Sequence, residues 1–249
     1  MHVLQSLVLP NLEVGNEEAM YVRPNAMVWT ELARRCVHFD AGGVLSTDTF
    51  YNGLTVAAWK GSCEVRTLAL ELRGSGRFVL TLGLHRRGQA SVWLQEQMVD
   101  LQPGQPHRLP VRAWDRVRDG LLFVRMRALT PGHLHEARWL TADAPARDVR
   151  LGIVITHFNR VQQVLPAIRR IVDFITSRED LNDRVTLTVV DNSQNLPLRS
   201  HGLLTVVPNR NFGGSGGFVR GLLELMDSGR HSHALFMDDD ASCEVEAIA

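Results

Sequence analysis

The chain has 249 residues, more than the roughly 100 to 200 of a typical single domain, so two domains are expected. Apolar residues make up 45% of it and charged residues 22%, a composition that supports a buried core and excludes a disordered chain. The 27 Lys and Arg balance the 27 Asp and Glu, so no overall charge attracts nucleic acid. The sequence therefore predicts a globular protein without a nucleic-acid partner.

Cysteine usage and the N-terminal sequence predict the compartment. Cys36, Cys63 and Cys243 are too few and too widely spaced for a disulfide framework, which favours a reducing, cytoplasmic setting. The first residues lack the basic region of a signal peptide, and no apolar run reaches the roughly 18 to 20 residues of a membrane span. We expect a cytoplasmic protein. Peripheral association with the inner face of the plasma membrane and oligomer formation both stay open.

Residues 1–145 are predicted to form an accessory domain, an antiparallel β-sandwich. Short strand-like runs are separated by turn residues, among them Gly74–Gly76. Such regular spacing is typical of a sandwich. The runs are Leu54–Trp59, Val65–Leu72, Phe78–Leu84, Ala90–Leu94 and Gly120–Arg127. The small, polar, proline-containing segment Thr141–Asp148 then indicates a linker.

Residues 146–249 change to an alternation of strands and helices. Continuous apolar runs predict four strands of a parallel sheet covered on both faces. Two stretches with apolar residues at helical spacing, beginning near Val161 and Gly217, predict the intervening helices. The strands are Leu151–Thr156, Arg184–Val190, Leu203–Val207 and His233–Met237. This pattern predicts an open α/β sheet, in which ligands bind beyond the carboxyl ends of the strands.

Two residues at predicted strand ends are candidates for binding. Asp191 follows a buried strand and could accept hydrogen bonds from a base or ribose, although Asp191-Asn-Ser is also ordinary turn chemistry. Arg160 follows the first strand, and its planar guanidinium suits a diphosphate or a base. The alternative for Arg160 is a solvated arginine at a helix start.

A glycine-rich stretch between the third strand and the second helix is more specific. Its glycines permit positive φ and close approach of the backbone to a ligand, and the helix start offers unpaired N–H groups to an anion or sugar. Asn209 and Asn211 flank it, and their amides could lock a defined loop. The glycines are Gly213, Gly214, Gly216 and Gly217. The sequence is neither a Walker A loop nor a Rossmann fingerprint, and the alternative is a flexible surface loop.

Three consecutive acids, Asp238 to Asp240, follow the fourth strand. Such a charge concentration is usually balanced by a hard divalent cation. In an extended segment Asp238 and Asp240 would project to the same side and share one ion, while Asp239 would point elsewhere. The alternative is a solvated acidic turn.

These motifs resemble those of family 2 inverting glycosyltransferases with a GT-A fold. Within that family the chain is most similar to the galactofuranosyltransferases of mycobacterial-type galactan synthesis, whose catalytic domain also follows an N-terminal β-sandwich. The resemblance rests on Phe158–Arg160, Val189–Ser193, Asn209–Gly221 and Phe236–Asp240, and more loosely on Asp48–Asn52 and Trp59. It implies a second domain that is the first half of an α/β, Rossmann-like GT-A nucleotide-sugar domain.

The resemblance also implies roles for the candidates. Arg160 and Asp191 would hold the uracil and ribose of a UDP-sugar, and Asn209, Asn211 and the four glycines would face the diphosphate and sugar. Asp238 would contact the donor and, with Asp240, bind Mn²⁺ or Mg²⁺. The implied reaction transfers galactofuranose from UDP-galactofuranose, with inversion, to a growing cell-wall or surface glycan or a lipid-linked glycan.

In the resembled family the catalytic base and a metal-binding histidine come later than the acidic motif. The general base is therefore expected beyond Ala249, and the chain is expected to be a truncated enzyme, inactive by itself. Glu244 and Glu246 more simply belong to the first turn of a helix. Arg220 could approach the donor or form a salt bridge.

Three alternatives stay open. A rhamnosyltransferase of the same superfamily would use dTDP-rhamnose. A nucleotidyltransferase would also use paired acids and a metal, but it should carry a basic, glycine-rich loop after the first strand, and Thr156–Arg160 is not such a loop. The third is a non-catalytic carbohydrate-binding protein, in which Trp59, Trp93 and Trp139 of the sandwich offer aromatic surfaces to a glycan. Exposed tryptophans would favour binding, and buried ones would favour a role in packing.

Overall fold

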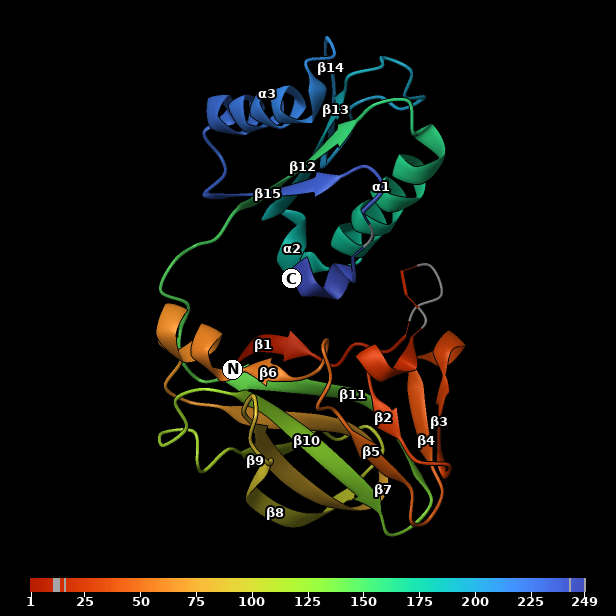
Figure 1. Cartoon of the computed structure of the whole chain (residues 1–249), viewed down its shortest axis with the longest axis vertical. Coiled ribbons are helices and arrows are strands. Elements are labelled where there is room, and N and C mark those ends of the chain that lie inside the picture. Colours follow the sequence, from red (N-terminus) through yellow and green to blue (C-terminus); the bar gives the residue numbers. More distant parts are fainter. Residues whose placement is uncertain (11–13, 16, 242, 249) are drawn as a thin grey trace. The chain divides into compact units, whose positions relative to one another are not determined.

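The structure, a computed structural model, divides into two compact units, Met1–Pro145 and Ala146–Ala249. It describes residues 1–10, 14–15, 17–241 and 243–248 (Figure 1). Strands hold 40% of the chain and helices 22%, so the protein is mostly β. Each unit has its own sheet and its own core.

The first unit is built on an 11-stranded antiparallel sheet. The long strand β7 (Ala69–His85) runs through its centre. The other strands are β1 (His2–Ser6), β2 (Arg23–Pro24), β3 (Val28–Glu31), β4 (Cys36–Phe39), β5 (Val44–Ser46), β6 (Leu54–Thr55), β8 (Val92–Leu101), β9 (His107–Pro110), β10 (Leu121–Ala128) and β11 (Gly132–Thr141). Short helices occupy Glu18–Met20, Leu32–Arg34 and Ala58–Ser62.

Strand β7 belongs to both layers of a β-sandwich. Its first half pairs with β9 and β11, and its second half pairs with β8 and β10. The predicted turn at Gly74–Gly76 is wrong, because the strand continues through it. A Cβ on Gly74 would lie 2.1 Å from the His133 carbonyl oxygen, and Gly76 has φ +108°. These glycines let β7 cross close to β11 and change layers, as glycines inside strands often do.

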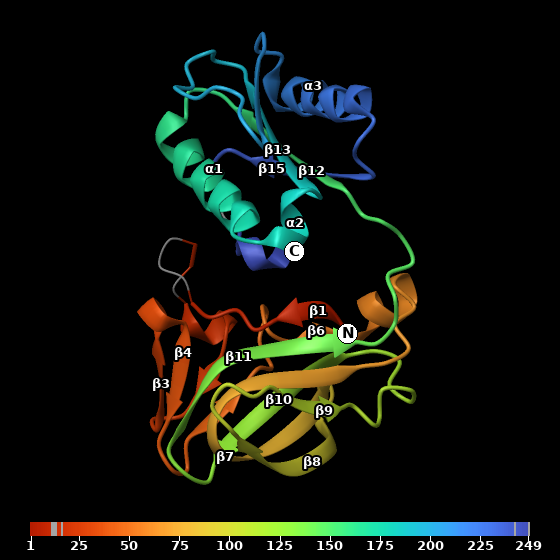
Figure 2. The same ribbon diagram turned by 180° about the vertical axis from the view of Figure 1, so that it is seen from behind.

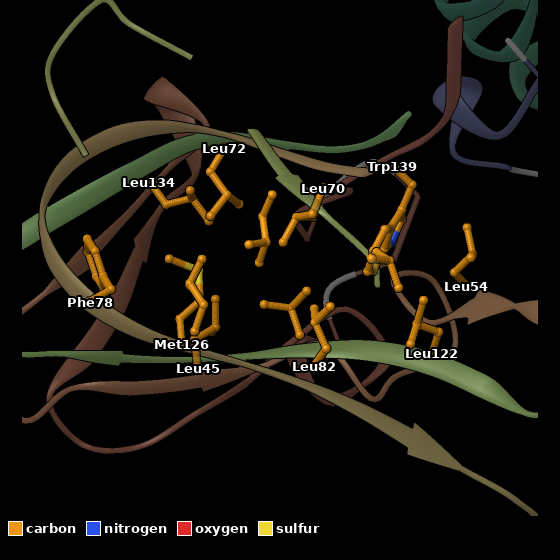
Figure 3. Packing of buried hydrophobic residues seen from close by; sticks show 14 of the residues in the cluster. Leu45, Leu54, Leu70, Leu72, Phe78, Leu82, Leu122, Met126, Leu134 and Trp139 are labelled. Carbon is orange, nitrogen blue, oxygen red and sulfur yellow. The ribbon is translucent and has the colours of Figure 1, made fainter. Parts of the chain in front are cut away.

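The core of the first unit lies between these layers. Leu72 and Leu134, from the layer of β11 and the first half of β7, face Leu82, Met126 and Leu45 of the other layer (Figure 3). Residues of β7 point inward at every second position, namely Phe78, Leu80, Leu82 and Leu84. Because strand side chains alternate between faces, the residues between them lie on the outer face.

Two segments of the first unit depart from the predictions. The run Leu54–Trp59 is a strand only at Leu54–Thr55 and then becomes helical. The segment Asp48–Asn52 has a structural role, since Asn52 is buried and its amide bonds the backbone of Val8 and Tyr21 at 2.6 to 2.8 Å. This side chain therefore ties the N-terminal segment to the sandwich.

The second unit holds a four-stranded parallel sheet in the order β14-β13-β12-β15. Its strands are β12 (Leu151–His157), β13 (Val185–Asp191), β14 (Leu204–Pro208) and β15 (His233–Asp238). Its helices are α1 (Val161–Thr176), α2 (Glu179–Asn182), α3 (Gly213–Ser228) and the short Val245–Ile248. The register places Thr156 beside Val190 and Asp238, so the carboxyl ends of three strands meet at one edge.

Helices α1 and α3 cover opposite faces of this sheet (Figures 1 and 2). The α1 side is packed with Ile and Val side chains, and the α3 side is smaller. Close packing of α3 depends on two of its glycines. A Cβ on Gly217 would lie 2.3 Å from the Thr156 methyl group, and one on Gly221 would lie 2.3 Å from Val154.

The predicted fold class is wrong for the second unit. A GT-A domain was expected, but the molecule is mostly β and residues 146–249 do not form a clear GT-A half. The error has a physical reason: parallel strands that end in acids, with a glycine-rich helix start, suit many α/β sheets and do not identify one family. No helix among the described residues is long and apolar enough to cross a membrane.

Candidate functional site

Asp191 lies at the carboxyl end of β13, and its carboxylate accepts the hydrogen bonds of the turn that follows. One carboxylate oxygen accepts hydrogen bonds from the Ser193 backbone N–H and hydroxyl, both at 3.0 Å. The other accepts one from the Leu196 N–H at 2.8 Å. The side chain is buried, and each of its oxygens accepts a hydrogen bond within the turn.

Arg160 lies before α1 and pairs with the acids after β15. Its guanidinium contacts Asp240 and lies 3.4 Å from Asp239. Asp239 is buried, accepts a hydrogen bond from the Phe158 N–H and lies 3.4 Å from His157 Nδ1. The structure thus brings two predicted segments, Phe158–Arg160 and Asp238–Asp240, together through Asp239 and His157, neither of which we selected from the sequence.

Asp239 is buried because the acidic segment does not stay extended after Asp238. Strand β15 ends at Asp238, and the chain turns there, with the Ala241 N–H bonded to the Asp238 carbonyl at 3.2 Å. Asp239 therefore points inward, while Asp238 and Asp240 are exposed. A fully buried histidine at the end of β12 gave no signal of its own in the sequence.

The predicted divalent metal ion finds a poor donor set at this edge. Carboxylates suit Mg²⁺ or Mn²⁺, but Asp240 is already engaged by Arg160. Within the described part of the chain, no group of three or more His, Cys, Asp or Glu side chains could hold a metal ion. Mn²⁺ or Mg²⁺ at Asp238 and Asp240 stays a prediction.

The asparagines of the glycine-rich stretch fix its backbone. Asn209 donates a hydrogen bond to the Asn192 side chain at 2.8 Å, and Asn211 accepts one from the Gly213 N–H at 2.9 Å. Helix α3 begins at Gly213, so the glycines form its first turns rather than a loop. Gly213 and Gly214 face open space, Gly216 lies against the Phe212 side chain and Gly217 against Thr156.

The remaining charged candidates of this unit lie on or beside its helices. Arg220 forms an i,i+4 salt bridge with Glu224 at 2.5 Å. The Glu244 carbonyl accepts the Ala247 N–H at the start of the short C-terminal helix, which contains Glu246. Ala249, beyond which the base was expected, lies outside the described residues.

The tryptophans of the sandwich separate into packed and exposed ones. Trp139 is buried in the core, and Trp59 is partly buried and packs against that core. Trp93 is 52% exposed on β8, and Trp29, which we did not select, is 50% exposed on β3. Of the three predicted aromatic surfaces Trp93 is the most exposed.

Strand register aligns Trp93 with other residues of the outer face. Trp93 pairs with Gly83, and Gly83 pairs with Phe123 on the next strand. The neighbouring row on the same face is polar and crosses five strands: Glu96, Thr81, Arg125, Ser46 and Arg23. At about 4.8 Å between strands, this row is roughly 19 Å long.

The Trp93 side chain is supported from below and from the side. The Phe123 ring lies over Gly83, where a Cβ would come within 2.2 Å of it, and meets the indole edge to face at 5.8 Å. The Arg125 guanidinium lies 5.9 Å from the indole centroid. An open groove of ≈ 440 Å³ follows this face. Its lining residues are Thr81, Trp93, Leu94, Gln95, Glu96 and Arg125.

A second aromatic group lies on the other layer of the sandwich. Trp29 stacks on His38 at 5.3 Å, and His38 Nε2 lies 3.0 Å from a Glu31 carboxylate oxygen. The ring of His133 lies 6.4 Å from that of His38 and 4.4 Å from that of His135. Burial lowers the pKa of His133, and the neighbouring charges of His135 and His38 lower it further. Trp29 therefore stacks on His38, which is one of three neighbouring histidines with His133 and His135.

No protein-family model and no curated protein matches the chain. Among solved structures, it is similar to the C-terminal family 6 carbohydrate-binding module of a marine laminarinase from Zobellia galactanivorans, at 14% identity and a TM-score of 0.32, covering 48% of this chain and 91% of that one. A family 22 module from a Clostridium thermocellum xylanase gives 14% identity and 0.30, covering 51% and 88%. A structure of that enzyme's other family 22 module with its catalytic module gives 10% and 0.36, covering 77% and 38%.

These comparisons contradict the glycosyltransferase resemblance and the enzyme activity drawn from it. The structures found are mainly carbohydrate-binding modules, and neither a glycosyltransferase nor a GT-A family supports the prediction. The predicted transfer of galactofuranose or rhamnose is therefore wrong, and the comparisons do not support a UDP-sugar donor. Since all three TM-scores are below 0.5, the case for a function has to rest on the chain's own residues.

Proposed function

We propose that the Met1–Pro145 unit binds a carbohydrate on the outer face of β7, β8 and β10, around Trp93. The observation that carries the proposal is the half-exposed indole, fixed by Phe123 and bordered by a polar row. An exposed aromatic ring offers an apolar surface to the C–H face of a sugar, while nearby polar groups orient its hydroxyls.

The polar row supplies both kinds of hydrogen-bonding group. Arg125 carries donors only, and the Glu96 carboxylate carries acceptors only. The Thr81 hydroxyl donates to Glu96 at 3.1 Å and keeps a lone pair for a ligand. A sugar hydroxyl donates and accepts at once, so this mixture suits a polyhydroxylated ligand. The open groove admits a chain longer than one sugar ring.

The proposal is tested by affinity electrophoresis and calorimetry of the full chain against a panel of soluble polysaccharides. W93A is expected to weaken binding by about tenfold or more, because truncating a central aromatic contact commonly costs about 2 kcal/mol. W29A is the matched control, since it removes a tryptophan of equal exposure from the other layer. Equal losses in the two variants, or no polysaccharide bound by the wild-type chain, would overturn the proposal.

A further inference from the structure

The outer face that carries Trp93 also carries two arginines without an acidic partner. Arg125 and Arg127 are two positions apart on β10, so both point outward. Neither forms an ion pair with any residue that the structure describes. Some other arginines of this unit are paired, for example Arg86 with Asp119 at 2.7 Å and Arg108 with Glu71 at 2.6 Å.

The acids of this face do not neutralise the two arginines. Asp48 lies 3.8 Å from Arg23, and Glu96 stands two strands from Arg125, with Thr81 between them and no ion pair joining these two described residues. Arg77 and Asp100 stand opposite each other at the far end of β7 and β8. Excess positive charge therefore remains on β10, beside the aromatic ring.

We infer that the ligand of this face is an anionic glycan, one whose sugars carry carboxylate or sulfate groups. This inference rests on the proposed carbohydrate site at Trp93. Arg125 lies in the row next to Trp93, so a sugar stacked on the indole places its substituents within reach of that guanidinium. The planar fork of an arginine binds a carboxylate or sulfate through two hydrogen bonds.

Arg127 offers a second guanidinium for an anionic group farther along β10. The two guanidinium-bearing positions are roughly 7 Å apart along β10. Between strands, Arg127 is flanked by Val79 and Val44, which offer no competing carboxylate. Two anionic groups on successive parts of one glycan can therefore each meet an arginine.

The test compares ligands that differ only in charge. Calorimetry of the full chain uses oligogalacturonate against its methyl ester, and a sulfated galactan against its desulfated form. The charged member of at least one pair is expected to bind at least about tenfold more tightly, the effect of one charge-assisted contact. The pair that shows the difference identifies carboxylate or sulfate as the recognised group.

Arginine variants assign the effect to this face. R127Q is expected to remove about tenfold of the affinity for the charged ligand and to leave the neutral ligand unchanged, while R125Q is expected to weaken the charged ligand by about tenfold more than the neutral one. R87Q is the matched control, because it removes an equal charge from an exposed turn of the same unit. Equal losses in all three variants would mean non-specific attraction and would overturn the inference.

The outcomes separate this inference from the proposed function. If neutral and charged ligands bind equally and only W93A weakens them, the carbohydrate site stands and the anionic preference is wrong. If neither kind of ligand binds the wild-type chain, both are wrong. Circular dichroism of each variant shows whether the sandwich is still folded.

Discussion

Gly83→Ala is the sharpest test of how the exposed tryptophan is held. A Cβ at this position would lie 2.2 Å from Cζ of Phe123 and 2.6 and 2.7 Å from its two Cε atoms. Carbon atoms in contact are normally about 3.5 to 4.0 Å apart, so the ring has to move by roughly 1.5 Å. Because Phe123 meets the Trp93 indole edge to face, this movement displaces Trp93 as well.

The size of the effect follows from packing. Overpacking a dense site costs about 1 to 3 kcal/mol, which for a unit of this length lowers the melting temperature by roughly 3 to 10 °C. Affinity for the glycan should fall too, since the indole no longer lies in place over the sheet. Thermal and urea unfolding measure the first effect, and calorimetry measures the second.

Two controls make this prediction refutable. Gly61→Ala adds the same methyl group where nothing lies within 4 Å, and it should be nearly neutral. Phe123→Leu removes the Cζ and Cε atoms that cause the clash, so Gly83→Ala should cost less in that background, a coupling that a double-mutant cycle measures. If Gly83→Ala costs no more than Gly61→Ala, or costs the same with Leu at position 123, the packing argument is wrong.

Three further predictions concern charge. Hydrogen bonds from backbone N–H groups and hydroxyls lower the pKa of Asp143 to about 2, so its stabilisation is complete above about pH 4 and is lost as the pH falls through 2. D143N should therefore cost about 1 kcal/mol in urea unfolding at pH 7 and nothing near pH 2. The pKa of His133 is lowered by burial and His135, so stability should fall as the pH drops below about 6.5, and less steeply in H133Q. If Mn²⁺ binds at Asp238 and Asp240, the D238N/D240N variant should lose its calorimetric signal.

The parallel strands of the second unit could be predicted from the sequence because each is a continuous apolar run. The strand expected at Leu151–Thr156 is β12, Leu151–His157, and the one expected at His233–Met237 is β15, His233–Asp238. What these runs could not predict was the conformation after the last apolar residue. The chain turns after Asp238, which buries Asp239 and leaves Asp238 and Asp240 exposed.

In the first unit, residue type alone did not determine the local structure. Glycine serves equally as a turn residue and as a point of close backbone approach, so Gly74–Gly76 predicted a break where β7 crosses β11. The tryptophans were equally ambiguous, because a ring at a strand position can face the core or the solvent. Only the register separates Trp139, in the core, from Trp93, on the outer face.

The register also explains why Trp93 can be a rigid platform rather than a mobile surface residue. An indole on an open sheet face needs a neighbour that restricts its rotation, and a large neighbour on the adjacent position of β7 would lift it off the sheet. Gly83 meets both requirements. It has no side chain that would lift the indole, and the space it leaves lets the Phe123 ring extend from β10 and contact the indole. Phe123 is consequently buried on a face that is otherwise exposed. A site that immobilises an aromatic ring before a ligand arrives loses less entropy on binding, which is the property a carbohydrate platform requires.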